Sequence, residues 1–147
     1  MPVFKYPFQP QLEYDPLTQK ATGIILQPKI PIFLKVNGIL HIFKIEPHVD
    51  SGATRNLFPA DPLDSLGIPL KNNRKRVHIG IGEHQLVSYT HEVEILIANY
   101  RFITEIDFSR EQRAPLLGVE SFFRFFDHVN FNMEQSQLEL SYSVKKN

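Results

Sequence analysis

The sequence predicts one all-β domain with little helix, within a chain of 147 residues. Apolar and polar residues alternate with period two in several segments, as expected of strands that bury one face. Between these segments stand turn-forming residues, and Asn37-Gly38 is the strongest hairpin signal among them. Four prolines within the first 16 residues exclude a long helix near the N-terminus.

The composition excludes several classes of partner. The 16 Lys and Arg residues balance the 16 Asp and Glu residues, so we expect no nucleic-acid partner. The chain has no Cys, and therefore neither a disulfide framework nor a thiol nucleophile. No apolar run is long enough to cross a bilayer, and the N-terminus has no signal-like apolar segment. We expect a soluble, cytoplasmic protein that does not associate with membranes.

Residues 1–27 are predicted to form an N-terminal arm. Their prolines permit short edge strands, for which residues 3–6 and 23–26 are the candidates. An arm that packs on the body or on a partner is the first interpretation, and a removable pro-segment is the alternative.

The next stretch predicts a hairpin. Residues 30–36 form its first strand, Asn37-Gly38 supplies the two positive-φ positions of a type I′ turn, and residues 39–43 return. We expect the return strand to deliver Asp50 to its tip.

A short helix is predicted after this strand. Asp61 suits the N-cap, Pro62 the first helical position and Gly67 the position after the C-cap. Leu63 and Leu66 would face the core. A loop with two tight turns is the alternative, because the same residues favour turns.

The following segment predicts two antiparallel pairs. The basic run at residues 71–76 is read as a solvated loop, because no aromatic residues are interleaved for stacking on bases. Residues 76–87 form two strands around Gly80-Ile81-Gly82, which is no phosphate loop because no helix start follows. Residues 92–97 and 100–108 form the second pair around Ala98-Asn99.

The last third predicts a strand, a buried helix and a closing hairpin. Leu116-Leu117-Gly118 is an apolar strand that ends in glycine, and residues 119–126 fit a short helix whose phenylalanines pack in the core. Residues 128–132 and 137–140 form the hairpin.

The candidate site is Asp50-Ser51-Gly52-Ala53, a carboxylate at the end of an apolar segment followed by small residues. Asp, Ser and Gly favour a turn, and small residues leave room for a ligand to approach. A plain Asx-turn is the alternative interpretation of these residues alone.

Three stretches together resemble the retropepsin-like aspartic proteases over roughly residues 28–140. Asp50-Ser51-Gly52-Ala53 resembles the family's active-site motif, Gly80-Ile81-Gly82 its flap, and Leu116-Leu117-Gly118 its apolar-apolar-Gly motif, in the family's order. The resemblance implies a retropepsin-like acid protease barrel with one or two short helices over residues 28–147. It implies Asp50 as the catalytic residue. It also implies substrate contacts by Ser51, Gly52 and Ala53 and by Gly80, Ile81 and Gly82.

The sequence departs from the viral members at one pair of positions. Where these have Asp after Gly-Ala and Arg after the apolar-apolar-Gly motif, this chain has Thr54 and Val119. Because the Asp and the Arg are both absent, neither is left as a buried charge without its partner. Arg55 and Glu120, one residue later in each motif, are candidates for a substitute pair.

The expected function is peptide hydrolysis by two carboxylates that share a proton. Only Asp50 is followed by Ser-Gly, so the second carboxylate must come from a second copy of the chain across a two-fold axis. The predicted partners are thus a homodimer mate and a peptide or protein substrate, with no cofactor. A catalytically silent, dimeric peptide-binding module on the same fold is the alternative. No metal site is expected, because the six histidines show no HExxH or similar spacing.

Overall fold

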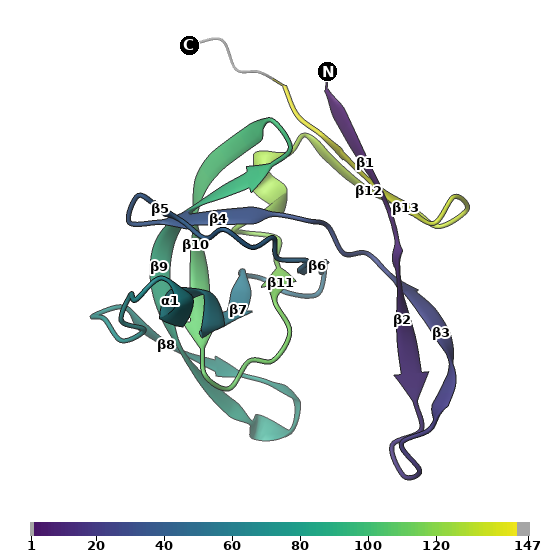
Figure 1. The fold of residues 1–147 in the computed structure, drawn as a ribbon, viewed down its shortest axis with the longest axis horizontal. Coiled ribbons are helices and arrows are strands. Elements are labelled where there is room, and N and C mark those ends of the chain that lie inside the picture. The colour runs from purple at the N-terminus through teal and green to yellow at the C-terminus, as the bar shows by residue number, and fades with distance from the viewer. Residues whose placement is uncertain (1, 144–147) are drawn as a thin grey trace. The chain divides into compact units, whose positions relative to one another are not determined.

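A computed structural model of the chain describes residues 2–143. It divides into two compact units, one of residues 30–125 and one that joins residues 2–29 to residues 126–143. Figure 1 shows both units. The boundary expected between residues 27 and 28 stays a prediction. No helix among residues 2–143 is both long and apolar enough to cross a membrane.

The unit of residues 30–125 is built on one eight-stranded sheet, with neighbours in the order β5-β4-β9-β10-β7-β11-β6 and with β8 paired to β9. Its strands are β4 (Phe33–Val36), β5 (Ile39–Leu40), β6 (His48–Val49), β7 (Leu57–Pro59), β8 (Lys75–Ile79), β9 (Gln85–Ile97), β10 (Tyr100–Ser109) and β11 (Leu116–Leu117). Its helices are α1 (Asp61–Ser65) and the 3₁₀ helices η1 (Ile81–Glu83) and η2 (Phe123–Phe125). The predicted all-β class is confirmed.

The long pair β9 and β10 forms the centre of this sheet. The strands meet antiparallel from Tyr89 opposite Phe108 to Ile97 opposite Tyr100, as the alternating pattern predicts. Along β9 the side chains of Val93, Ile95 and Ile97 are buried, at intervals of two residues. The N-terminal end of β9 continues beyond β10 and pairs with β8 instead.

The hairpin around Asn37-Gly38 is confirmed, and its return strand is shorter than predicted. Asn37 and Gly38 have φ values of 51° and 75°, as a type I′ turn requires. Strand β5 ends at Leu40, and Ile42 and Phe43 are 72% and 68% exposed. The His41 Nδ1 atom lies 2.9 Å from the Phe43 carbonyl oxygen, at a bend that interrupts the pairing with β4.

The return segment still leads to Asp50, although not as one continuous strand: Ile45 pairs again with Ile32, and the Ile30 N–H donates to the Pro47 carbonyl at 3.2 Å. A separate strand, β6, precedes Asp50, and it is held by parallel pairing with β11. The partner that fixes this strand lies almost 70 residues downstream, beyond what local sequence patterns report.

Helix α1 forms where predicted but begins one residue earlier. Ala60 is the N-cap, with φ and ψ of −73° and −10°, and its methyl side chain offers no capping hydrogen bond. Asp61 thus lies in the first turn, where its charge complements the helix dipole, and was wrongly assigned as the cap. Gly67 follows the C-cap with φ 69°, as predicted, and Leu63 is fully buried.

The phenylalanines after Gly118 are only partly in the core: Phe122 and Phe126 are buried, whereas Phe123 and Phe125, in the short 3₁₀ helix η2, are half-buried. Phe122 is fully buried, and the rings of Phe102 and Phe125 stack with centroids 4.3 Å apart. A second ring contact, between Phe58 and Phe108, joins β7 to β10. Aromatic burial of this kind supplies much of the stability of a small core.

The unit of residues 2–29 and 126–143 contains two separate sheets. Its strands are β1 (Val3–Pro7), β2 (Gln9–Tyr14), β3 (Ala21–Gln27), β12 (His128–Asn132) and β13 (Gln137–Ser141). The predicted closing hairpin is β12–β13, and β1 adds to it by pairing with β13. The strands predicted at residues 3–6 and 23–26 are confirmed. Strand β2, which pairs with β3, was not predicted.

Candidate active site

Asp50 lies at the point where β6 ends. Its backbone N–H donates to the Leu117 carbonyl at 2.9 Å, so the neighbouring strand β11 fixes the residue's main chain. The preceding residue, Val49, is 2% exposed, whereas Asp50 is partly exposed. A buried strand therefore ends in a carboxylate that solvent and ligands can reach.

The residues after Asp50 form a tight turn around its carboxylate. The Gly52 N–H donates to Asp50 Oδ1 at 2.8 Å, and the Ala53 N–H donates to the Asp50 carbonyl at 3.2 Å. A Cβ atom at position 52 would lie 3.2 Å from Oδ1, so glycine allows this close approach. Among the hydrogen bonds between residues 2–143, none uses Asp50 Oδ2. The turn thus positions one carboxylate oxygen and leaves the other for chemistry.

Gly118 passes directly beneath this turn. The Val119 and Glu120 N–H groups donate to the Ala53 and Thr54 carbonyls at 2.9 and 2.7 Å. A Cβ atom at position 118 would lie only 2.6 Å from the Arg55 carbonyl oxygen and 2.8 Å from that of Ala53. No other residue type fits here without a shift of the backbone.

Asn56 joins the same elements from inside, and sequence reasoning missed it. Its side chain is fully buried and accepts a hydrogen bond from the Gly118 N–H at 2.9 Å. Its amide nitrogen donates to the carbonyls of Glu105 and Ser121, at 3.0 and 2.9 Å. Asn56 therefore uses both ends of its amide to connect the loop after Asp50, β10 and the exit of β11. An Asn two residues after Thr54 carries no local signal of this role.

Arg55 does not pair with Glu120 in the described chain, so the expected substitute pair is wrong. Arg55 Nε donates to Asp107 Oδ2 at 2.8 Å, and its Nη2 atom donates to Asp107 Oδ1 at 3.0 Å and reaches Glu105 at 3.4 Å. The hydrogen bond to Asp107 raises the pKa of Arg55. Burial alone would raise the pKa of Asp107, but hydrogen bonds from Arg55 and Thr90 bring it below its usual value.

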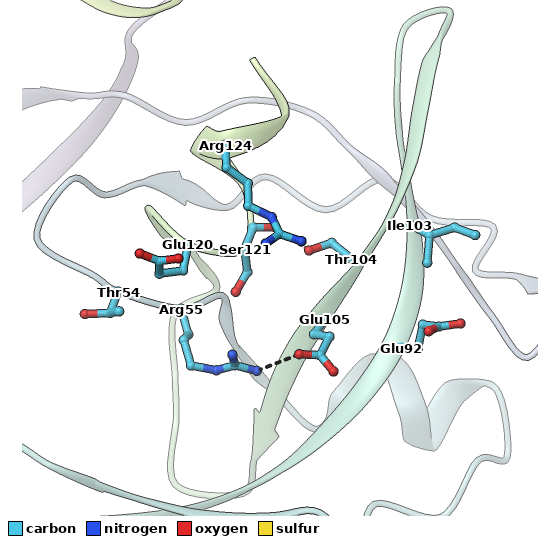
Figure 2. Close-up of a pocket in the computed structure, with 9 residues that line it drawn as sticks. All are labelled: Thr54, Arg55, Glu92, Ile103, Thr104, Glu105, Glu120, Ser121 and Arg124. Atoms are coloured by element: carbon cyan, nitrogen blue, oxygen red, sulfur yellow. Dashed lines mark hydrogen bonds and ion pairs between the residues drawn. The ribbon is translucent and has the colours of Figure 1, made fainter. Parts of the chain in front are cut away.

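A polar pocket of about 370 Å³ adjoins this loop (Figure 2). It is lined by Thr54, Arg55, Glu92, Ile103, Thr104, Glu105, Glu120, Ser121 and Arg124. Figure 2 shows Arg55 directed at Glu105, and Glu120 forms no ion pair within residues 2–143. Asp50 itself does not line the pocket. The pocket is a neighbour of the catalytic candidate and not a cleft around it.

The Gly80-Ile81-Gly82 segment forms the tip of the β8–β9 hairpin. Gly82 has φ 79°, which favours glycine, and the Gly80 N–H closes the tip by donating to the His84 carbonyl at 2.9 Å. Gly80 and Gly82 are exposed. The hairpin is confirmed. Its role as a flap, and the substrate contacts of Ser51, Gly52, Ala53 and this tip, stay predictions.

No group of three or more His, Asp or Glu side chains within residues 2–143 could hold a metal ion.

Comparison with known proteins identifies the fold. No protein-family model matches the chain, and no curated protein matches its sequence. Its structure is similar to a retropepsin-like aspartic protease from Rickettsia conorii, with a TM-score of 0.57 and 18% identity over 96% of this chain and 92% of that one. It is similar to the EIAV protease complexed with the inhibitor HBY-793, with a TM-score of 0.50 and 14% identity over 63% and 81%. It is also similar to the retroviral protease-like domain of Ddi1 from Leishmania major, with a TM-score of 0.51 and 12% identity over 80% and 95%. The predicted retropepsin-like fold is therefore confirmed, and identities this low establish the fold alone.

Proposed function

We propose that the chain is an aspartic endopeptidase and that Asp50 is its catalytic residue. The observation that carries the proposal is the Asp50 carboxylate at the end of β6 in a retropepsin-like fold. Its Oδ1 atom is held by the Gly52 N–H, and its side chain is partly exposed. The turn that holds it is locked to β11 through Gly118, so the carboxylate is preorganised for chemistry.

The active form is a homodimer. Hydrolysis by paired carboxylates needs two acids at one site, and this chain carries a single Asp-Ser-Gly. A two-fold axis brings a second Asp50 next to the first, since an isologous interface places the same residue opposite itself. Each chain then supplies half of the cleft.

The reaction uses water as the nucleophile and forms no covalent enzyme intermediate. One Asp50 carboxylate takes a proton from the water while the other, protonated, donates its proton to the oxygen of the scissile carbonyl. The oxygen of the water forms a bond to the carbonyl carbon and gives a tetrahedral diol. A proton then passes to the amide nitrogen, the C–N bond breaks, and an acid and an amine leave.

The substrate is a peptide or protein segment in an extended conformation. We place its backbone between Ser51, Gly52 and Ala53 on one side and the tip at Gly80 to Gly82 on the other. Small residues let main-chain groups approach a peptide backbone closely, and a glycine hinge lets the tip close over it.

Cleavage of a peptide library at several acidic pH values tests the proposal, with Asp50→Asn measured beside the native protein. We expect cleavage by the native protein alone, and sedimentation should show dimers of both. An active monomer would contradict the shared site. Peptide binding without cleavage by either protein would favour the alternative, a catalytically silent dimeric peptide-binding module.

A further inference from the structure

A single buried carboxylate, that of Asp107, collects contacts from three separate segments of the chain. Asp107 lies on the central strand β10, and its side chain is completely buried. A buried charge is strongly destabilising unless neighbours neutralise it and donate hydrogen bonds. The partners of Asp107 therefore show which segments the fold holds together at this point.

The first segment is the loop that follows Asp50. Arg55 donates to both Asp107 oxygens, and the backbone on either side of Arg55 is fixed to β11 and its exit through Ala53, Thr54 and Asn56. Because Arg55 lies five positions after Asp50, its position constrains where the turn around Asp50 can lie. Asp107 is in this way connected to the candidate catalytic residue through one side chain.

The other two segments are the strands of the β8–β9 hairpin. Thr90 Oγ1, on β9, donates to Asp107 Oδ1 at 2.7 Å. On β8, His78 Nε2 lies 2.9 Å from Ser88 Oγ on β9 and 3.3 Å from Asp107 Oδ2. Arg76 Nε donates to Thr90 Oγ1 at 3.1 Å and lies 4.0 Å from Asp107 Oδ1. Arg76 and His78 are two residues apart and so share one face of the strand, while Val77 and Ile79 on the other face are 51% and 73% exposed.

Strand β8 depends on these side chains for its polar contact with β10. In the sheet of the described residues β8 pairs with β9 only, and β9 itself leaves β10 beyond Tyr89. On the β9 side, Ser109 Oγ donates to the Val87 carbonyl at 2.6 Å. On the β8 side, Arg76 and His78 reach Asp107.

We propose that Asp107 is a positioning residue that fastens the β8–β9 hairpin to the loop bearing Asp50. Its effect on catalysis rests on the proposed function, since the hairpin matters to turnover only if its tip meets the substrate. Asp107 fixes the position of the hairpin relative to the loop. Arg76 and His78 extend this effect to β8, because both side chains lie close to the Asp107 carboxylate. Substrate affinity then depends on a carboxylate that does not touch the substrate.

The groups around Asp107 keep its buried carboxylate charged. Arg55, Arg76 and His78 face its carboxylate, and beyond Arg55 lies Glu105, which Arg74 also pairs with (Figure 2 shows the Arg55–Glu105 pair). Burial opposes ionisation of Asp107, but the hydrogen bonds of Arg55 and Thr90 keep its pKa below the usual value.

Hydrogen exchange on the full chain tests this role of Asp107 without relying on activity. We expect faster amide exchange over residues 75–89 in Asp107→Asn and in His78→Gln. Asp64→Asn is the matched control, because Asp64 also accepts from an arginine, Arg110, but on the exposed surface, and should leave these residues unchanged. His78 is partly exposed, so His78→Gln replaces Asp107→Asn if the latter does not fold. Because His78 Nε2 also lies 2.9 Å from Ser88 Oγ, Ser88→Ala is measured beside it, and equal exchange in these two variants overturns the role of Asp107. Unchanged exchange over residues 75–89 in the folded variants overturns the proposal.

Steady-state kinetics separate this proposal from the proposed function. If the native protein cleaves peptides, His78→Gln should raise KM severalfold with a smaller change in kcat, because loss of the contact with Asp107 leaves the hairpin less firmly positioned. An unchanged KM overturns the catalytic part of the proposal while the peptidase assignment stands. If the native protein cleaves nothing, the peptidase assignment fails, and the exchange experiment still decides whether Asp107 holds the hairpin.

Discussion

The Arg55 guanidinium donates one hydrogen bond to each oxygen of the buried Asp107 carboxylate, from Nε at 2.8 Å and from Nη2 at 3.0 Å. The two residues are 52 positions apart in the sequence. The planar guanidinium matches a carboxylate in this two-point geometry, which a lysine cannot reproduce. The pair joins the candidate catalytic loop to the centre of the sheet, and the first two predictions concern it.

Removal of the arginine should destabilise the protein strongly. Arg55→Met leaves the Asp107 carboxylate buried without its main partner, and loss of one member of a buried pair costs about 3–5 kcal/mol. Urea unfolding at a fixed protein concentration measures this free energy, because a dimer's stability depends on concentration. Arg110→Met is the control, since it breaks an exposed pair with Asp64, and its effect should be much smaller. Equal effects of the two changes would contradict a structural role for the buried pair.

The stability of the protein should fall in acid because of Asp107. Its pKa is below the usual value in the folded state, so the unfolded chain binds a proton at a higher pH than the native one. The stabilisation is therefore complete above the unfolded pKa, about 3.9, and is lost as pH falls through the lower native pKa. Urea unfolding from pH 7 to pH 2.5 should show a steep acid limb that is shallower in Asp107→Asn. Parallel limbs for the two proteins would show that other groups control acid unfolding.

Gly118 should tolerate no side chain. In Gly118→Ala the new Cβ meets backbone atoms of Ala53 and Arg55 closer than 3 Å, and overpacking of this kind costs about 1–3 kcal/mol. The turn around Asp50 must shift, so peptide cleavage should fall as well. Gly23→Ala on β3 is the control, because nothing lies within 4 Å of its Cβ position. A Gly118→Ala protein with native stability and native activity would rule out the close approach described here.

Gly82→Val should reduce turnover more than it reduces stability. A branched residue at φ 79° is strained by about 1–2 kcal/mol, and it stiffens the tip that we expect to close over a substrate. Gly38→Val carries similar strain at φ 75° in the β4–β5 turn. The two variants should lose similar stability, while kcat/KM falls only for Gly82→Val. Equal losses of activity in the two variants would show that the tip has no specific role in catalysis.

Peptide cleavage should have a bell-shaped pH dependence with an acidic optimum. Two Asp50 carboxylates at one site cannot both ionise easily, so they share one proton, and the singly protonated pair is the reactive form. Activity is lost as pH rises and the shared proton leaves, and again at very low pH when both acids are protonated. Initial rates from pH 3 to pH 8, with circular dichroism at each pH to separate unfolding, measure the profile. Activity that persists in a dimeric Asp50→Asn protein would refute the mechanism.

The sequence by itself determined the features that depend on neighbouring residues. Asn37-Gly38 specified a turn with two positive φ angles, and the alternation along β9 specified which face is buried. Gly67 specified the end of α1 because glycine adopts the conformation required there at little cost. The motif order around Asp50 was also sufficient to predict the retropepsin-like fold, which the comparisons confirm. For the turn, the strand face and the helix end, the deciding energy is local sterics or the burial of one face of a strand, whereas the fold was predicted from the resemblance of the motifs to a known family.

Tertiary structure alone decided which charged groups meet. Along β10 the face that carries Ile103, Glu105 and Asp107 goes from exposed to fully buried, because other segments cover its C-terminal end. Consecutive residues of a strand point to opposite faces, and Ile106 is buried. Period-two alternation alone would therefore leave the side chain of Asp107 exposed. Arg55 therefore reaches Asp107 and not Glu120, although Glu120 follows the motif that packs beneath its loop. Which carboxylate pairs with Arg55 depends on distances between residues some 50 positions apart and on the free-energy cost of leaving a buried charge unpaired. The local sequence pattern contains neither quantity.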